Sequence, residues 1–175
     1  MKIFLVRHTA VDVPRGTCYG QTDVPLLDTF EAEAALTRQR LGEEPFDAVY
    51  TSPLSRAARL AAFCGYPAAV RDDRLKELDC GDWEMRRFDE IDDPRLQEWY
   101  ADYYHVPTTH GESFADLHAR VSSFLDELRQ KPFRRVAVFA HGGVLIAARI
   151  YAGVVDKESA WDALTPYGGV VEIEL

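Results

Sequence analysis

The sequence predicts an α/β protein, a three-layer α/β/α sandwich around a mainly parallel mixed sheet. Two apolar runs, residues 3–6 and 135–140, have the length and residue types of strands that are buried on both faces. Segments with helical character separate the predicted strands, and this alternation is typical of parallel sheets. Arg7 and His8 follow the first run, and His141 directly follows the second. Because ligands bind at the carboxyl ends of such strands, we expect one site that contains both imidazoles.

The remaining elements alternate along the chain in the same way. The predicted strands cover residues 2–7, 47–51, 69–71, 135–140 and 170–174, and the predicted helices cover about 28–41, 55–65, 113–131, 144 onward and 157–163. Asp28 with Glu31, and Ser113 with Asp116, have the spacing of capping boxes and predict two helix starts. The short segment around Glu77 follows the third predicted strand.

The length of 175 residues predicts a single domain over residues 1–175. Residues 82–112 differ in character, because aromatic side chains and carboxylates are concentrated there. We interpret this segment as a cap excursion laid over the site. Its aromatic side chains either line the substrate pocket or are simply buried, and the sequence leaves both alternatives open.

The overall charge and the cysteines restrict the partners. A net charge of -9 argues against nucleic-acid binding, and no apolar run has the length of a membrane span. The chain starts on a predicted strand rather than a signal peptide, and its three cysteines lack metal-ligand spacing, so we expect a reduced, cytoplasmic protein. We expect a small phosphorylated metabolite as partner; the sequence leaves the oligomeric state open, a homodimer included.

Two arginines and two histidines suit the binding of a phosphoryl group. The guanidinium groups of Arg7 and Arg56 match phosphate oxygens in planar, bidentate contacts. A neutral imidazole is a nucleophile that forms a covalent phospho-enzyme, and we assign this role to His8, with His141 as charge stabiliser. The leaving alkoxide needs a proton, for which Glu77 is the candidate acid.

Five motifs in this order carry a resemblance to a known family. They are Leu5–His8, Gly20–Leu26, Tyr50–Ala57, Leu78–Glu84 behind Glu77, and Gly111–Ser113 followed by Ala140–Val144. The chain resembles the histidine phosphatases of the phosphoglycerate mutase-like superfamily over nearly its whole length. The resemblance implies a phosphohistidine at His8, a phosphoryl pocket from Arg7, Arg56 and His141, proton donation by Glu77, and neither metal nor cofactor.

The loop after His8 departs from the family pattern. Thr9 stands where the family usually has glycine, and Ala10, Val11 and Pro14 stand where it often has polar side chains. Thr9 or the loop of residues 19–21 is then expected to supply the missing phosphate contacts. The predicted substrate-binding residues are therefore Arg7, Thr9, Gly20, Gln21, Arg56 and Gly142.

Among the short members of the superfamily the chain looks most like alpha-ribazole phosphatases. Its short length and aromatic-rich cap also suit a flat heteroaromatic substrate. We therefore expect a metal-independent phosphomonoester hydrolase acting on alpha-ribazole 5′-phosphate in cobalamin nucleotide-loop assembly. The alternatives are a phosphatase of another substrate, such as a sugar phosphate or a phosphohistidine protein, and an inactive phosphate-binding or scaffold member.

Two other chemistries compete on sequence spacing. Cys80 and Arg86 fit the C-x5-R spacing of cysteine phosphatases, but the acidic residues between them disfavour a phosphate cradle. His105 and His110 lie among carboxylates, but their spacing fits no standard metal-ligand pattern.

Overall fold

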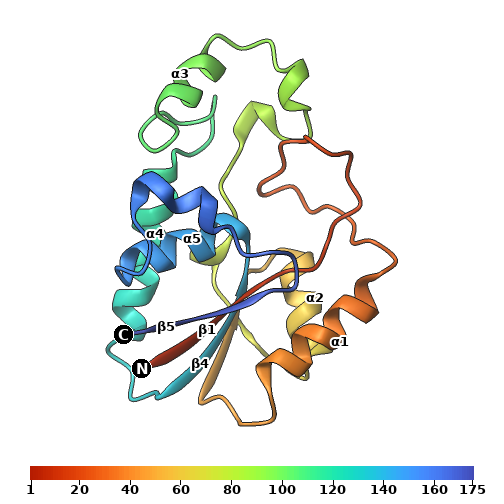
Figure 1. Cartoon of the computed structure of the whole chain (residues 1–175), viewed down its shortest axis with the longest axis vertical. Coiled ribbons are helices and arrows are strands. Elements are labelled where there is room, and N and C mark those ends of the chain that lie inside the picture. Colours follow the sequence, from red (N-terminus) through yellow and green to blue (C-terminus); the bar gives the residue numbers. More distant parts are fainter.

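The computed structural model describes residues 1–175 and contains one five-stranded sheet in the order β3-β2-β4-β1-β5 (Figure 1). The strands are β1 (Lys2–Arg7), β2 (Ala48–Thr51), β3 (Val70–Arg71), β4 (Arg135–Ala140) and β5 (Val170–Glu174). The pairs β3–β2, β2–β4 and β4–β1 are parallel, and β5 is antiparallel to β1. The predicted mainly parallel mixed sheet is confirmed.

Helices cover both faces of the sheet, because the buried strands present apolar side chains alternately to either side. The helices are α1 (Phe30–Leu41), α2 (Ser55–Phe63), α3 (Arg95–Ala101), α4 (Phe114–Leu128) and α5 (Gly142–Tyr151). Ile3 and Leu5 of β1 belong to the core beneath α4 and α5. Phe4 and Val6 belong to the smaller core beneath α1 and α2. This three-layer arrangement is the predicted sandwich.

The two predicted capping boxes have different outcomes. At α4 the hydroxyl of Ser113 accepts the N–H of Asp116 at 3.2 Å, and the Asp116 carboxylate accepts the N–H of Ser113 at 2.9 Å. The box predicted at Asp28 is wrong, because α1 starts one residue later, after Thr29. The Thr29 hydroxyl donates to Glu33, whose carboxylate also accepts the N–H of Ala10 and so ties α1 to the loop after His8.

Residues 81–112 form a separate layer beyond the carboxyl ends of the strands, at the top of Figure 1. This segment contains α3 and two short 3-10 helices at Gly81–Trp83 and Phe88–Glu90. Trp83 is fully buried, and its indole N–H donates to Asp93 at 2.8 Å. The segment coincides with the predicted cap, and we keep the interpretation of residues 1–175 as a single domain.

A helix that spans a membrane needs a long apolar stretch, and none of the helices has one.

Candidate active site

Two imidazoles meet at the carboxyl edge of the sheet, as the strand pattern predicts. In the pairing of β1 with β4, Arg7 lies opposite Ala140, so the residues that follow them are also neighbours. The backbone N–H of His8 donates to the Ala140 carbonyl at 3.1 Å. The ring centroids of His8 and His141 are 5.2 Å apart, and both side chains are buried.

His8 is held in the form that a nucleophile requires. Its Nδ1 lies 2.7 Å from the Thr9 carbonyl oxygen, which only accepts hydrogen bonds, so the proton resides on Nδ1 and the Nε2 lone pair is free. Burial lowers the pKa of His8 to about 3, and the charges of Arg56 and Arg7 act in the same direction. The imidazole is therefore neutral at neutral pH.

His141 is oriented by a chain of hydrogen bonds from β2. The N–H of Leu54 donates to the Ser52 hydroxyl at 3.3 Å, and that hydroxyl lies 2.8 Å from Nε2 of His141. Burial, together with the nearby Arg56 charge, holds the pKa of His141 well below its ordinary value. A hydroxyl proton donated to Nε2 leaves the proton of the neutral ring on Nδ1, which is buried and has no partner.

Two guanidinium groups lie beside these imidazoles and are held by backbone carbonyls. Arg7 donates from Nη1 to the Thr165 carbonyl at 2.6 Å. Arg56, which is fully buried, donates to the carbonyls of Thr22 at 2.9 Å and Gly20. The Nε atoms of both arginines are buried without a partner. Unpaired buried donors are rare in proteins, and a cluster of them around His8 fits an anionic ligand.

Glu77 faces the same cavity as His8 and Arg7. Its Oε2 accepts the N–H of Gly143 at 3.0 Å, at the start of α5, and its Oε1 accepts the N–H of Leu78 at 3.1 Å. The Glu77 carbonyl is held by Arg120 at 2.9 Å. A Cβ atom at residue 143 would lie 2.5 Å from Oε1, so only glycine allows this approach of the carboxylate to the helix.

Gly20 and Gln21, predicted as substrate-binding residues, do not line the cavity. They instead make hydrogen bonds to residues that surround the site. Their backbone N–H groups donate to Glu84 at 3.0 and 2.8 Å, and the Gln21 amide donates to the Glu77 carbonyl at 3.2 Å. The Glu84 carboxylate also accepts the Thr22 hydroxyl at 2.7 Å. These bonds lower the pKa of Glu84 against the opposing effect of its burial. Sequence reasoning assigned no role to Glu84, although it ends one of the quoted motifs.

Thr9 and Gly142, also predicted to bind substrate, follow His8 and His141 in the chain but do not line the cavity. Thr9 is fully buried, and its hydroxyl has no partner. Gly142 allows a close approach, because a Cβ atom there would lie 3.4 Å from the guanidinium carbon of Arg7.

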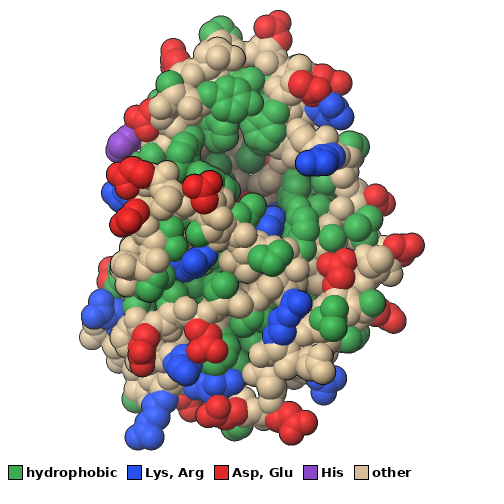
Figure 2. Space-filling model, viewed as in Figure 1, with side chains coloured by type: hydrophobic (Ala, Val, Ile, Leu, Met, Phe, Trp, Pro, Cys, Tyr) green, Lys and Arg blue, Asp and Glu red, His purple; other side chains and the backbone are tan.

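A cavity of about 380 Å³ opens above His8, Arg7 and Glu77. Figure 2 shows a hollow in the upper half of the molecule, bordered by hydrophobic side chains. The aromatic residues on its walls are Tyr19, Trp83, Phe88, Trp99, Phe114, Trp161 and Tyr167. Trp83, Phe88 and Trp99 belong to the predicted cap, so part of its aromatic content lines the cavity, whereas Tyr100, Tyr103 and Tyr104 do not.

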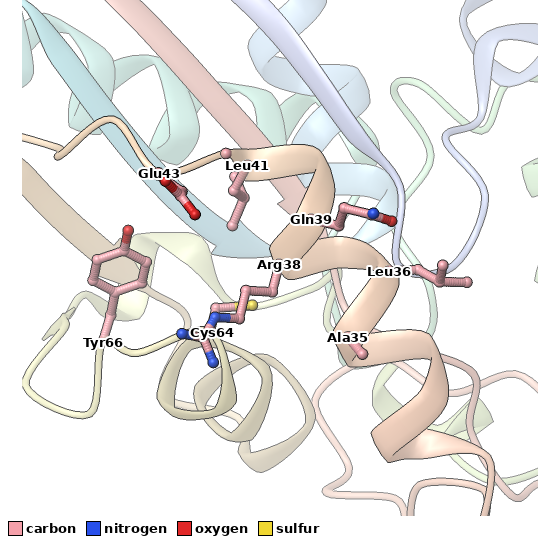
Figure 3. Close-up of a pocket in the computed structure, with 9 residues that line it drawn as sticks. Ala35, Leu36, Arg38, Gln39, Leu41, Glu43, Cys64 and Tyr66 are labelled. Atoms are coloured by element: carbon pink, nitrogen blue, oxygen red, sulfur yellow. The ribbon is translucent and has the colours of Figure 1, made fainter.

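A second, larger hollow of about 740 Å³ lies against α1 and the residues that follow α2. Figure 3 shows Arg38 and Leu41 of α1 on one wall and Cys64 and Tyr66, which follow α2, on the other. None of the predicted site residues lines this hollow. Of the predicted catalytic residues, Arg7, His8 and Glu77 line the first cavity, whereas Arg56 and His141 are fully buried and do not line it.

The comparison with known proteins agrees with this geometry. The family model of the histidine phosphatase superfamily (branch 1) matches residues 3–175. The chain belongs to the histidine phosphatase superfamily. Membership establishes a phosphatase at the level of the superfamily and confirms the resemblance carried by the motifs.

Relatives of this histidine phosphatase differ in the substrates that their names state. Phosphoserine phosphatase 1 of Hydrogenobacter thermophilus is 29% identical over 92% of this chain and 80% of its own length. The adenosylcobalamin/alpha-ribazole phosphatase of Salmonella typhimurium is 29% identical over 83% of this chain and 76% of its own length. The crystal structure of the alpha-ribazole phosphatase from Shigella flexneri has a TM-score of 0.90, 26% identity, and coverage of 100% of this chain and 91% of that one.

The two competing chemistries find no support in this histidine phosphatase. Cys80 is buried, and a hydrogen bond with Cys18 together with burial raises the pKa of its thiol. Arg86 donates a hydrogen bond to the Glu90 carbonyl. His105 and His110 are exposed and pair with separate carboxylates. No group of three or more histidine, cysteine or acidic side chains has the geometry to hold a metal ion.

The low pKa of His8 predicts a specific loss of stability in acid. The unfolded chain takes up a proton on this side chain near pH 6.5, whereas the folded protein does so only near pH 3. The stability contributed by the neutral ring is therefore full above about pH 6.5 and is lost as the pH falls toward 3. When the pH falls from 7 to 5, the unfolding free energy of the wild type is expected to decrease by about 1–2 kcal/mol more than that of His8→Gln.

Urea unfolding at several pH values measures this difference. The comparison at pH 8 isolates the packing change of the substitution, because the ring is neutral there in both folded and unfolded states. Parallel pH dependence in the two proteins would show that His8 titrates normally.

Proposed function

We propose that this histidine phosphatase hydrolyses phosphomonoesters through a phosphohistidine at His8, without a metal or another cofactor. The observation that carries the proposal is a buried, neutral His8 with a free Nε2, surrounded by unpaired donors on Arg7, Arg56 and His141. Fixed donors of this kind stabilise the charge on the phosphoryl oxygens in the transition state.

The reaction needs two displacements at phosphorus. In the first, Nε2 of His8 forms a bond to phosphorus, the ester P–O bond breaks, and the acid form of Glu77 gives its proton to the leaving oxygen. In the second, the ionised Glu77 takes a proton from water while the water oxygen attacks phosphorus and the P–N bond breaks. Inorganic phosphate leaves, and both His8 and Glu77 return to their starting forms.

The lining of the cavity favours an aromatic leaving group. Apart from Arg7 and Glu77, which lie beside His8 at the phosphoryl end, its walls carry no charged side chain. The ammonium and carboxylate of phosphoserine, or the carboxylate of a phosphoglycerate, would be buried there with few counter-charges. We therefore propose alpha-ribazole 5′-phosphate as the substrate, whose flat base suits the aromatic walls. The alternatives are a phosphatase of a sugar phosphate or of a phosphohistidine protein, and an inactive scaffold.

The three cysteines are free and buried, which fits a cytoplasmic protein.

A covalent phosphoryl group on His8 is the first expected result. Rapid quenching with labelled substrate, in the presence of a chelator, is expected to trap an acid-labile, base-stable phospho-enzyme in the wild type. His8→Ala is expected to lose the label. His118→Ala is the control and is expected to retain it, because His118 lies on α4 and contacts Tyr104. Label in His8→Ala would refute the assignment, and dependence of labelling on a divalent ion would refute metal independence.

Glu77 is expected to matter only when the leaving group needs a proton. Glu77→Gln is expected to slow the phosphorylation step for an alkyl phosphate by roughly 10²–10⁴-fold, and to slow an aryl phosphate much less, since a phenolate leaves unaided. Single-turnover kinetics on both esters measures the two losses. Asp82→Asn is the matched control, because Asp82 is exposed and pairs with His110. Equal losses on both esters would assign Glu77 to binding or structure.

The apolar walls predict substrate selectivity. We expect kcat/KM for alpha-ribazole 5′-phosphate to exceed that for phosphoserine and 3-phosphoglycerate by at least roughly 10²-fold, because the charged competitors leave buried groups unpaired. Trp99→Leu is expected to reduce this preference, whereas Tyr100→Leu, next to it but outside the cavity, is expected to preserve it. Faster turnover of phosphoserine than of the heteroaromatic ester would overturn the substrate assignment.

A further inference from the structure

Two tyrosines from distant parts of the chain form a bridge between the two arginines of the site. Tyr19 lies in the loop after β1 and Tyr167 in the turn before β5, and their hydroxyl oxygens are 2.7 Å apart. The guanidinium carbon of Arg7 lies 4.0 Å from the ring centroid of Tyr167. The guanidinium carbon of Arg56 lies 5.4 Å from the ring centroid of Tyr19. The four side chains therefore form one continuous series.

The Tyr167 end of this series contacts Arg7. One hydrogen bond, to the Thr165 carbonyl, and the face of the Tyr167 ring hold the guanidinium plane, while its Nε remains free. Cations bind favourably over the face of an aromatic ring. The same ring lies 5.5 Å from the ring of His8, between centroids, so it adjoins both the nucleophile and its neighbouring cation.

The Tyr19 end reaches the second arginine through the loop that holds it. Arg56 donates to the carbonyls of Gly20 and Thr22, which lie one and three residues after Tyr19. Burial and the hydrogen bond to Tyr167 raise the pKa of Tyr19, so the phenol stays protonated and the hydroxyl pair persists at neutral pH. The loop after His8 has no polar side-chain atom at Ala10, Val11 or Pro14 that could hold the arginines in place of the tyrosines.

We propose that the Tyr19–Tyr167 pair is a positioning bridge that sets the spacing and orientation of Arg7 and Arg56 for the phosphoryl group. The proposal rests on the proposed function in that it requires a phosphoryl site between these arginines, but it does not require turnover. Neither tyrosine needs to touch the reacting atoms.

The test measures the binding of inorganic phosphate to the full chain by calorimetry. Tyr19→Phe and Tyr167→Phe keep both rings and remove the hydroxyl hydrogen bond, and each is expected to weaken phosphate binding roughly threefold to tenfold. The double variant is expected to bind no more weakly than either single variant, because all three lose the same bond. Tyr103→Phe is the matched control, because its hydroxyl donates to the Lys157 carbonyl, outside the bridge.

Two further measurements separate positioning from general stability. Thermal unfolding without phosphate is expected to be alike in the three Tyr→Phe variants that alter the bridge, the Tyr103→Phe control and the wild type. Tyr167→Leu, which also removes the ring over Arg7, is expected to weaken binding more than Tyr167→Phe. In turnover, the bridge variants are expected to raise KM more than they lower kcat.

Wild-type phosphate affinity in both single variants, or losses that multiply in the double variant, would overturn the bridge. If the wild type binds phosphate but forms no phosphohistidine, the proposed function fails while the bridge is still judged by binding. If the wild type binds no phosphate, both fail.

Discussion

The parallel pairing of β1 with β4 is the constraint on which the site depends. Its register sets Arg7 opposite Ala140, so that His8 and His141 leave the sheet side by side. A shift by one residue would exchange the two faces of a strand and turn the apolar side chains away from their cores. Because both faces of β1 are packed against helices, such a shift is strongly opposed, and the positions of the imidazoles are as fixed as the cores themselves.

The charged groups of the site are stabilised by backbone atoms more than by ion pairs. Arg56 is fully buried, yet its hydrogen bonds go to the carbonyls of the 20–22 loop. That loop is in turn held by the Glu84 carboxylate, which accepts its N–H groups. An arginine neutralised by a direct salt bridge would be less available to an anion. With carbonyl partners it keeps its positive charge, and its free Nε remains available as a donor to an anion.

The sequence predicts the elements whose signals are local. Buried strands and the histidines behind them are visible in short runs, and the box of Ser113 with Asp116 is a four-residue pattern. Glu84 and Tyr167 are different. The loop groups that Glu84 holds lie 62–64 residues away, the hydroxyl partner of Tyr167 lies 148 residues away, and no spacing rule connects these positions. The first turn of α1 also has a distant partner, since Glu33 accepts the N–H of Ala10 in the loop after β1.

The cavity separates two tasks between two parts of the chain. The ends of β1 and β4 and the start of α2 supply Arg7, His8, His141 and Arg56 of the proposed phosphoryl site, and their positions follow from the sheet. Trp83, Phe88 and Trp99 of residues 81–112, with Phe114 and Trp161, supply the apolar walls around the leaving group. Trp83 is anchored by Asp93, and Trp99 packs edge-on against it with ring centroids 5.9 Å apart. Residues 81–112 contribute little to the two main cores, so their side chains can be substituted without disturbing the strand register. The arginines and histidines, by contrast, are fixed by the ends of the strands. Relatives that share the phosphoryl chemistry and differ in substrate are the expected consequence of that separation.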